Sequence, residues 1–318
     1  MLTKNLNSLG NQFSISLPTD KNGFVSRRCP KCEGIFKIKP GTGMQGSNLP
    51  FHCPYCGWKK DMSEFNTPEQ IEYAKSVAIN KIMGALQRDV QEWGRELENS
   101  TKNSFIKMKI DFKSNPHQVQ YYQEKQLETN ITCEVCTLEY AIYGVFAFCP
   151  DCGTHNSIQI LNKNMELVQK EITLANSLDD KEISLSIMED ALENAVSAFD
   201  GFGRATSLAF SSKSSDEKQA KETSFQNIFT ARNRIQTLFG IDFASTISET
   251  EWETIIRCFQ KRHLLAHKMG VIDKEYIEKA KDPTAHLGRR ITISQDEVIE
   301  LSRLLKIIGK DLYEKLIS

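Results

Sequence analysis

The chain has 318 residues, 40% hydrophobic and 9% aromatic, so it can bury a substantial core and divide into two or three domains. It contains neither a secretory signal nor a run of about 18 apolar residues, so we expect a cytoplasmic protein without a membrane span. The formal net charge is −1, yet residues 1–60 carry nine Lys or Arg against two Asp or Glu. Such basic end modules often meet nucleic acid, although short lysine-rich segments are also simply soluble.

Cysteine spacing is the strongest signal in the composition. Eight of the nine cysteines form four Cys-x-x-Cys pairs, and Cys258 is left over. Because no secretory signal accompanies them, the pairs predict metal knuckles and not disulfides. Two knuckles supply four thiolates to one tetrahedral Zn²⁺, so we expect two structural zinc ions per chain. The predicted ligands are Cys29, Cys32, Cys53 and Cys56 in one site and Cys133, Cys136, Cys149 and Cys152 in the other.

Residues 1–66 are predicted to hold a loose lead-in, up to residue 24, and a first zinc ribbon. Residues 35–38 alternate like a strand, and a flexible loop over residues 40–46 follows. The zinc either folds a module with a small core, or it supports a basic surface that contacts nucleic acid or a partner. His52 and Trp58 lie beside the knuckles and are candidates for packing or for ligand contact.

Residues 67–102 are predicted to form one long amphipathic helix. Thr67 is its cap, Pro68 takes the first helical position, and Gln70 closes a capping box. Residues 103–161 are predicted to form a second zinc ribbon. Its lead strand, residues 103–112, alternates and places Lys107 and Lys109 on one face. His155 follows the last knuckle but is not needed as a ligand.

Residues 162–318 are predicted to form an all-helical bundle, which makes the fold α+β and multidomain. The helices are expected over residues 162–176, 183–209, 225–239, from a cap at 248–251 to about 270, and from a cap at 294–297 to 316. Asp200-Gly-Phe-Gly203 lies inside the second of these. Because no strand precedes it and no Gly-Lys-Ser/Thr follows, its glycines indicate close helix packing or a kink, not a phosphate loop.

The helix that ends near Gly270 carries Arg262, His263 and His267. The two histidines are four residues apart and share a face, with Arg262 beside them. These histidines could be metal ligands, although no third ligand is fixed by spacing, or they could be satisfied within a helical core. A third interpretation is catalytic, since two imidazoles and a guanidinium are costly to bury unless they are used or paired.

The pattern Arg262-x-x-x-x-His267, late in a helical bundle, resembles the Arg-x(4–6)-His motif of the HEPN family (higher eukaryotes and prokaryotes nucleotide-binding). In many members a polar residue follows the arginine, and here it is His263. The resemblance covers residues 165–318 and leaves both ribbons outside. It implies a metal-independent endoribonuclease that acts as a homodimer through the helical bundle, with two motif helices forming one composite site.

The resemblance also implies roles. His267 would be the general acid or base, Arg262 would stabilise the phosphorane charge, and His263 would orient the phosphate or a partner side chain. An acidic residue on an earlier helix often assists, and the candidates here are Asp190, Glu193 and Asp200. RNA would be cleaved to a 2′,3′-cyclic phosphate and a 5′-hydroxyl. Such enzymes frequently serve as toxins or in antiviral defence under an antitoxin or regulatory protein. The alternative is a non-catalytic dimeric scaffold that binds RNA or a nucleotide.

Overall fold

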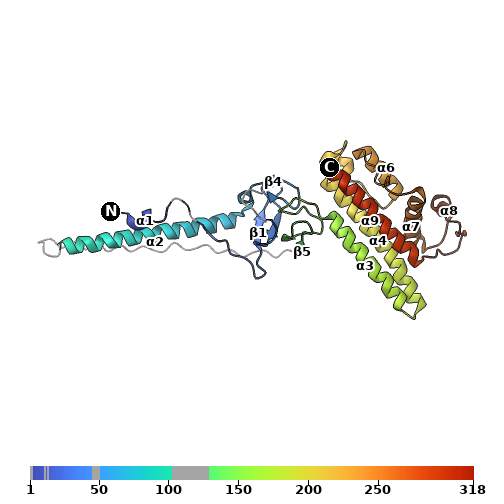
Figure 1. The fold of residues 1–318 in the computed structure, drawn as a ribbon, viewed down its shortest axis with the longest axis horizontal. Coiled ribbons are helices and arrows are strands. Elements are labelled where there is room, and N and C mark those ends of the chain that lie inside the picture. Colours follow the sequence, from blue (N-terminus) through green and yellow to red (C-terminus); the bar gives the residue numbers. More distant parts are fainter. Residues whose placement is uncertain (1–2, 11, 13, 45–50, 102–128) are drawn as a thin grey trace. The chain divides into compact units, whose positions relative to one another are not determined.

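The computed structural model describes residues 3–10, 12, 14–44, 51–101 and 129–318 (Figure 1). The strand predicted over residues 103–112, with Lys107 and Lys109, lies outside the described residues. The chain divides into two compact units, residues 1–144 with 150–153, and residues 145–149 with 154–318. None of the helices in the described ranges has both the length and the apolar character needed to cross a bilayer.

The first unit contains a four-stranded antiparallel sheet in the order β1-β2-β6-β5. Its strands are β1 (Val25–Arg28), β2 (Ile35–Ile38), β5 (Thr129–Thr132) and β6 (Glu139–Ile142). The pairing of β2 with β6 places Lys37 opposite Ala141 and Ile38 opposite Tyr140. Strands of both predicted ribbons, β1 and β2 of the first and β5 and β6 of the second, therefore share this sheet. A second, two-stranded sheet joins β3 (Phe51–His52) to β4 (Lys59–Lys60).

The long helix of the first unit, α2 (Pro68–Thr101), confirms the prediction for this segment. Its first turn is closed as expected, because the Gln70 N–H donates to Thr67 Oγ1 at 3.3 Å and the Thr67 N–H donates to Gln70 Oε1 at 3.1 Å. Before α2 comes a 3₁₀ turn, η1 (Met62–Phe65). The expected loose lead-in instead contains a short helix, α1 (Lys4–Asn7), in which the N–H groups of Asn5 and Leu6 donate to Asp89 of α2.

The second unit is a helical bundle, as the periodicity predicts. Its long helices are α3 (Ser157–Ser177), α4 (Lys181–Ala209), α6 (Ile228–Phe239), α7 (Glu249–Lys268) and α9 (Gln295–Ile317). The predicted caps are confirmed: capping boxes start α7 at Ser248 and α9 at Ser294, and Gly240 ends α6 in the left-handed region. Three short elements lie between them, η2 (Ser211–Lys213), α5 (Glu217–Lys221) and α8 (Lys274–Ala280). The helices expected from the sequence did not include these three segments.

Close packing at Gly203 of α4 organises the centre of this bundle. A Cβ at this position would lie 2.4 Å from ring carbons of Phe225, so only glycine allows the ring to approach. Phe225 packs in turn on Phe199 and Phe243 at centroid distances of 5.9 and 6.0 Å. Close helix packing, one of the two expectations for the glycines of the Asp200–Gly203 stretch, is therefore confirmed for Gly203.

Helices α7 and α9 are joined by a buried ion pair. The Lys261 side chain is 6% exposed, and its Nζ lies 2.7 and 2.8 Å from the two carboxylate oxygens of Glu297. It also donates to the Thr292 carbonyl at 2.7 Å. These bonds satisfy all three donors of the ammonium group and fix the position of α7 one residue before Arg262.

Candidate functional site

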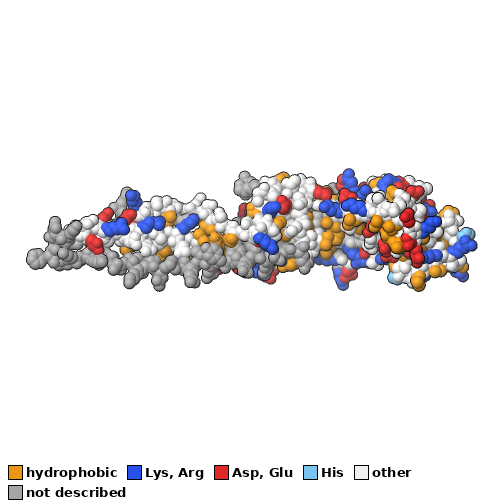
Figure 2. Space-filling view, turned by 90° about the horizontal axis from the view of Figure 1, so that it is seen from below, with side chains coloured by type: hydrophobic (Ala, Val, Ile, Leu, Met, Phe, Trp, Pro, Cys, Tyr) orange, Lys and Arg blue, Asp and Glu red, His pale blue; other side chains and the backbone are white. Residues whose placement is uncertain are grey.

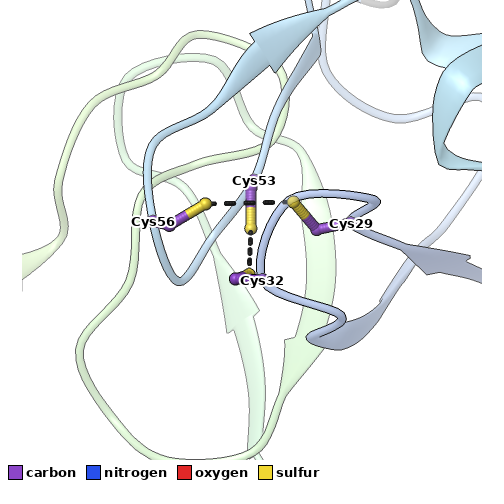
Figure 3. A group of neighbouring side chains, drawn as sticks. All are labelled: Cys29, Cys32, Cys53 and Cys56. Atoms are coloured by element: carbon purple, nitrogen blue, oxygen red, sulfur yellow. Dashed lines mark hydrogen bonds between the residues drawn. The ribbon is translucent and has the colours of Figure 1, made fainter.

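The first predicted zinc site is assembled at the ends of β1 and β3. The four Sγ atoms of Cys29, Cys32, Cys53 and Cys56 lie within 4.8 Å of one another and point inward (Figure 3). Tight turns hold both knuckles: the Glu33 N–H donates to the Cys29 carbonyl and the Gly57 N–H to the Cys53 carbonyl. Glu33 and Gly57 have φ of 60° and 65°, the left-handed conformation that such turns require.

Sulfur spacing in this group matches a tetrahedral zinc ion. Zn–S bonds of about 2.3 Å place the sulfurs of a tetrahedron about 3.8 Å apart. The Sγ atoms of Cys29 and Cys56 are 3.8 Å apart, and those of Cys32 and Cys53 are 3.5 Å apart. All four are free thiols. The group can therefore hold one zinc ion through four thiolates.

The second predicted site has the same form. Cys133, Cys136, Cys149 and Cys152 also lie with their Sγ atoms within 4.8 Å of one another, and those of Cys133 and Cys152 are 3.6 Å apart. His155 is not a member of this group. It is 4% exposed and packs edge-on to Phe148 at 4.8 Å, so it belongs to the core.

Hydrogen bonds connect the two sets of knuckles. The N–H of His52, next to Cys53, donates to the carbonyl of Pro150, next to Cys149, at 2.8 Å. The His52 ring leaves no space for a side chain at Gly153. The Tyr55 hydroxyl donates to Ile35 of β2 at 2.6 Å and accepts from the Tyr143 N–H at 3.1 Å. Packing was one of the two candidate roles of His52, whereas the role of Tyr55 was not predicted from the sequence.

The basic excess of residues 1–60 is only partly available at the surface. Arg27 is 7% exposed and donates to Ser26 and to Gln70. Lys37 is 3% exposed and pairs with Asp20 at 2.7 Å. Lysines that remain exposed include Lys31, Lys59 and Lys60. Trp58 packs on Phe65 at a centroid distance of 5.3 Å, which favours the packing role for this tryptophan.

Arg262, His263 and His267 lie in the last two turns of α7, near the surface of the bundle. Both histidines are exposed, and their ring centroids are 4.8 Å apart. His side chains are visible at the surface of the helical unit in Figure 2. Partial burial, followed by repulsion from His267, lowers the pKa of His263, so its imidazole is neutral at pH 7. Neither histidine is held within the core.

Arg262 is half-buried and lacks an acidic partner in the described part of the chain. Its Nε is shielded from water and makes no hydrogen bond there. Lys261 and Lys268 on the same helix are both paired with carboxylates, of Glu297 and Asp273. Arg262 is therefore a cation of α7 whose charge the described residues leave uncompensated.

The surroundings of Arg262, His263 and His267 bear on two further predictions, a metal site at the histidines and an assisting acidic residue. Among the described residues, only the two cysteine groups bring three or more potential metal ligands together, so His263 and His267 gain no third ligand there. Asp200 is 9% exposed, accepts from the Phe225 N–H at 2.6 Å and pairs with Arg204 at 2.9 Å. It therefore has a structural role, whereas Asp190 is exposed and Glu193 is half-buried.

Exposed apolar side chains follow the histidines, a feature that the sequence did not indicate. Met269, Val271 and Leu287 are 84%, 43% and 58% exposed. Backbone hydrogen bonds of Ile272 with Arg289 and Gly288 hold the segment that carries Leu287 against the end of α7.

No family model, curated protein or solved structure matches this chain.

Proposed function

We propose that this protein is a metal-independent endoribonuclease of the HEPN type, a toxin or antiviral-defence effector whose zinc ions are structural. The observation that supports this most is the surface of α7 itself. Two adjacent exposed imidazoles, His263 and His267, lie beside Arg262, an arginine with no carboxylate partner among the described residues. Uncompensated positive charge beside an exposed imidazole, which can accept or donate a proton, is what RNA transesterification requires.

Each side chain has a defined task in this reaction. The RNA 2′-hydroxyl oxygen attacks the adjacent phosphorus, and the bond from phosphorus to the 5′ oxygen breaks. His267 accepts the 2′-hydroxyl proton or delivers a proton to the leaving 5′ oxygen. Arg262 stabilises the charge on the phosphorane oxygens with its planar fork of N–H donors. The neutral His263 can donate one hydrogen bond to a phosphate oxygen and orient it.

A homodimer would supply the second acid or base. The supporting observation is the exposed apolar surface of Met269, Val271 and Leu287, which adjoins the histidines in sequence or through backbone pairing. Two copies related by a dyad would cover this surface and bring two motif helices together.

The carboxylate introduced by Leu287→Asp should then dissociate the dimer and abolish cleavage. Sedimentation measures the oligomeric state, and a gel assay measures RNA cleavage. Leu185→Asp, an equally exposed leucine on α4, is the matched control. A wild-type chain that is monomeric and active would contradict the dimer.

The catalytic assignment is tested with purified protein and a labelled single-stranded RNA. We expect Arg262→Ala and His267→Ala to lower the cleavage rate at least 100-fold, because each removes a group that acts in the transition state. Arg234→Ala, an exposed arginine on α6, should cleave like the wild type. The products should carry a 2′,3′-cyclic phosphate, and a 2′-deoxy substrate should stay intact.

The same experiment discriminates the alternative. RNA that is bound but left intact by the wild type, under conditions where the dimer persists, would reject the nuclease and favour the non-catalytic scaffold. Equal cleavage by all four proteins would reject the assignment of Arg262 and His267.

A further inference from the structure

A cleft of about 500 Å³ is lined by residues of helices α6, α7 and α8, and α7 neighbours both of the other two in the bundle (Figure 1). The proposed catalytic residues do not line it. Its apolar part is formed by the rings of Trp252 and Phe229 and the side chain of Ile256. Phe229 is 58% exposed, an unusual position for a phenylalanine in a bundle that buries most of its rings.

The cleft and the two histidines lie on one face of α7. Helical spacing places Trp252, Ile256, Gln260, His263 and His267 along a single stripe, because successive steps of three or four residues return to the same side. Ile256 and His263 are seven positions apart, which corresponds to about 10 Å along the helix axis. A ligand that reaches His267 along this face therefore passes the mouth of the cleft.

Charges lining the cleft are already balanced. Lys281 pairs with Glu253 at 2.7 Å, and Lys279 pairs with Glu275 at 2.7 Å. A phosphate would gain little there, because both lysines have carboxylate partners and Glu249 adds a further negative charge. The Gln260 amide, in contrast, makes no hydrogen bond within the described residues and offers two donors and an acceptor. An uncharged planar group with polar edges fits this lining.

We propose that the cleft binds one unpaired nucleobase of the RNA, from a nucleotide that flanks the scissile phosphate. This inference rests on the proposed ribonuclease function and adds a specificity site to it. The base stacks on the exposed Phe229 ring, and Gln260 hydrogen-bonds to its edge. The base is thereby fixed while the neighbouring phosphate lies beside Arg262 and His267.

The test uses labelled 2′-O-methyl tetranucleotides of A, C, G or U, which cannot be cleaved, so that binding is measured separately from catalysis. We expect Phe229→Leu to weaken binding about tenfold or more, because it keeps apolar bulk but removes the ring. Phe229→Tyr should retain wild-type affinity. Leu185→Ala, on an exposed surface of α4, should have no effect.

Two further readouts separate base from phosphate contacts. The dependence of affinity on salt should be unchanged in Phe229→Leu and shallower in Arg262→Ala, since the arginine neutralises phosphate charge and the phenylalanine does not. Gln260→Leu should change the order of preference among the four oligonucleotides.

Equal affinity of Phe229→Leu and wild type, or no binding by either, would overturn the cleft assignment and leave the cleft to another occupant such as a partner protein segment. If the wild type cleaved no RNA but its binding still depended on the Phe229 ring, the cleft assignment would stand and only the nuclease function would be rejected.

Discussion

At the scale of single residues, His155 is a histidine held in an environment that favours its neutral form. It is 4% exposed, lies between the rings of Phe148 and Phe210, and its Nδ1 has no hydrogen-bond partner. Burial lowers its pKa to about 4. The sequence placed His155 beside a knuckle but could not show its burial, because Phe210 comes from a different part of the chain.

This burial makes the stability of the bundle depend on pH. Above pH 6.5 His155 is neutral in both states and contributes no pH dependence. Between pH 6.5 and about 4 the unfolded chain binds a proton that the folded chain does not, so the free energy of unfolding falls as the pH falls. The expected slope is about 1 kcal/mol per pH unit. Below pH 4 both states are protonated and the loss is complete.

The check is urea denaturation of wild type and His155→Phe from pH 7 to pH 4.5, with the difference taken at each pH. The phenylalanine keeps a ring against Phe148 and Phe210 but has no titrating group, so its unfolding free energy should fall less steeply. Acid release of zinc affects both proteins and cancels in the difference. If the unfolding free energies of wild type and His155→Phe fell in parallel with pH, His155 would not be a buried neutral histidine.

At the scale of elements, the two glycines of α4 are predicted to respond in opposite directions. In Gly203→Ala the new methyl group would meet the Phe225 ring at 2.4 Å, so the bundle should lose about 1–3 kcal/mol. In Gly201→Ala the nearest atoms, of Phe146, are 3.9 Å away, and a helix gains up to about 1 kcal/mol when alanine replaces glycine. Thermal unfolding of the two variants measures whether each substitution lowers or raises stability. A similar loss of stability in both would refute the packing explanation.

Helix ends were predictable where their determinants are local. The capping boxes at Ser248 and Ser294 need only residues three apart in sequence, and both form as expected. Helix α8 (Lys274–Ala280) was missed because seven residues give too short an apolar stripe to recognise, although Tyr276 and Ala280 bury one face of it. The burial of Arg27 could not be predicted, because its determinant is distant in the sequence. Its charge was visible in the sequence, but its burial depends on a hydrogen bond to Gln70, which lies 43 residues later in the chain.

At the scale of the whole molecule, the members of the two cysteine groups could be predicted completely and their surroundings could not. Cys-x-x-Cys spacing alone identified all eight thiols. The pairing of β2 with β6 joins residues about a hundred positions apart, and no local pattern encodes such a register. The same holds for α7. Its motif residues were visible in the sequence, whereas the neighbouring cleft depends on α6 and α8, which approach only in the folded chain.

This shared sheet predicts that the two zinc sites are energetically coupled. Loss of the first ion in Cys53→Ser should loosen β2 and the His52–Pro150 hydrogen bond, and both contacts help to hold β6 and the Cys149–Cys152 turn. The second group should then bind zinc about tenfold more weakly, which corresponds to about 1.4 kcal/mol, the size of one or two lost hydrogen bonds.

The coupling is measured by competition with a chromophoric chelator, with zinc counted per chain. Wild type should hold two ions, as should Cys258→Ser, because Cys258 is buried outside both groups and burial raises its thiol pKa to about 12. Cys53→Ser should fall from two ions to less than one at chelator concentrations that leave the wild type loaded. If Cys53→Ser retained one ion with the affinity of the wild type, the two sites would not be coupled. In the coupled case, removing either metal weakens the whole of this sheet, because the central strands β2 and β6 pair with each other and each depends on the other for its position.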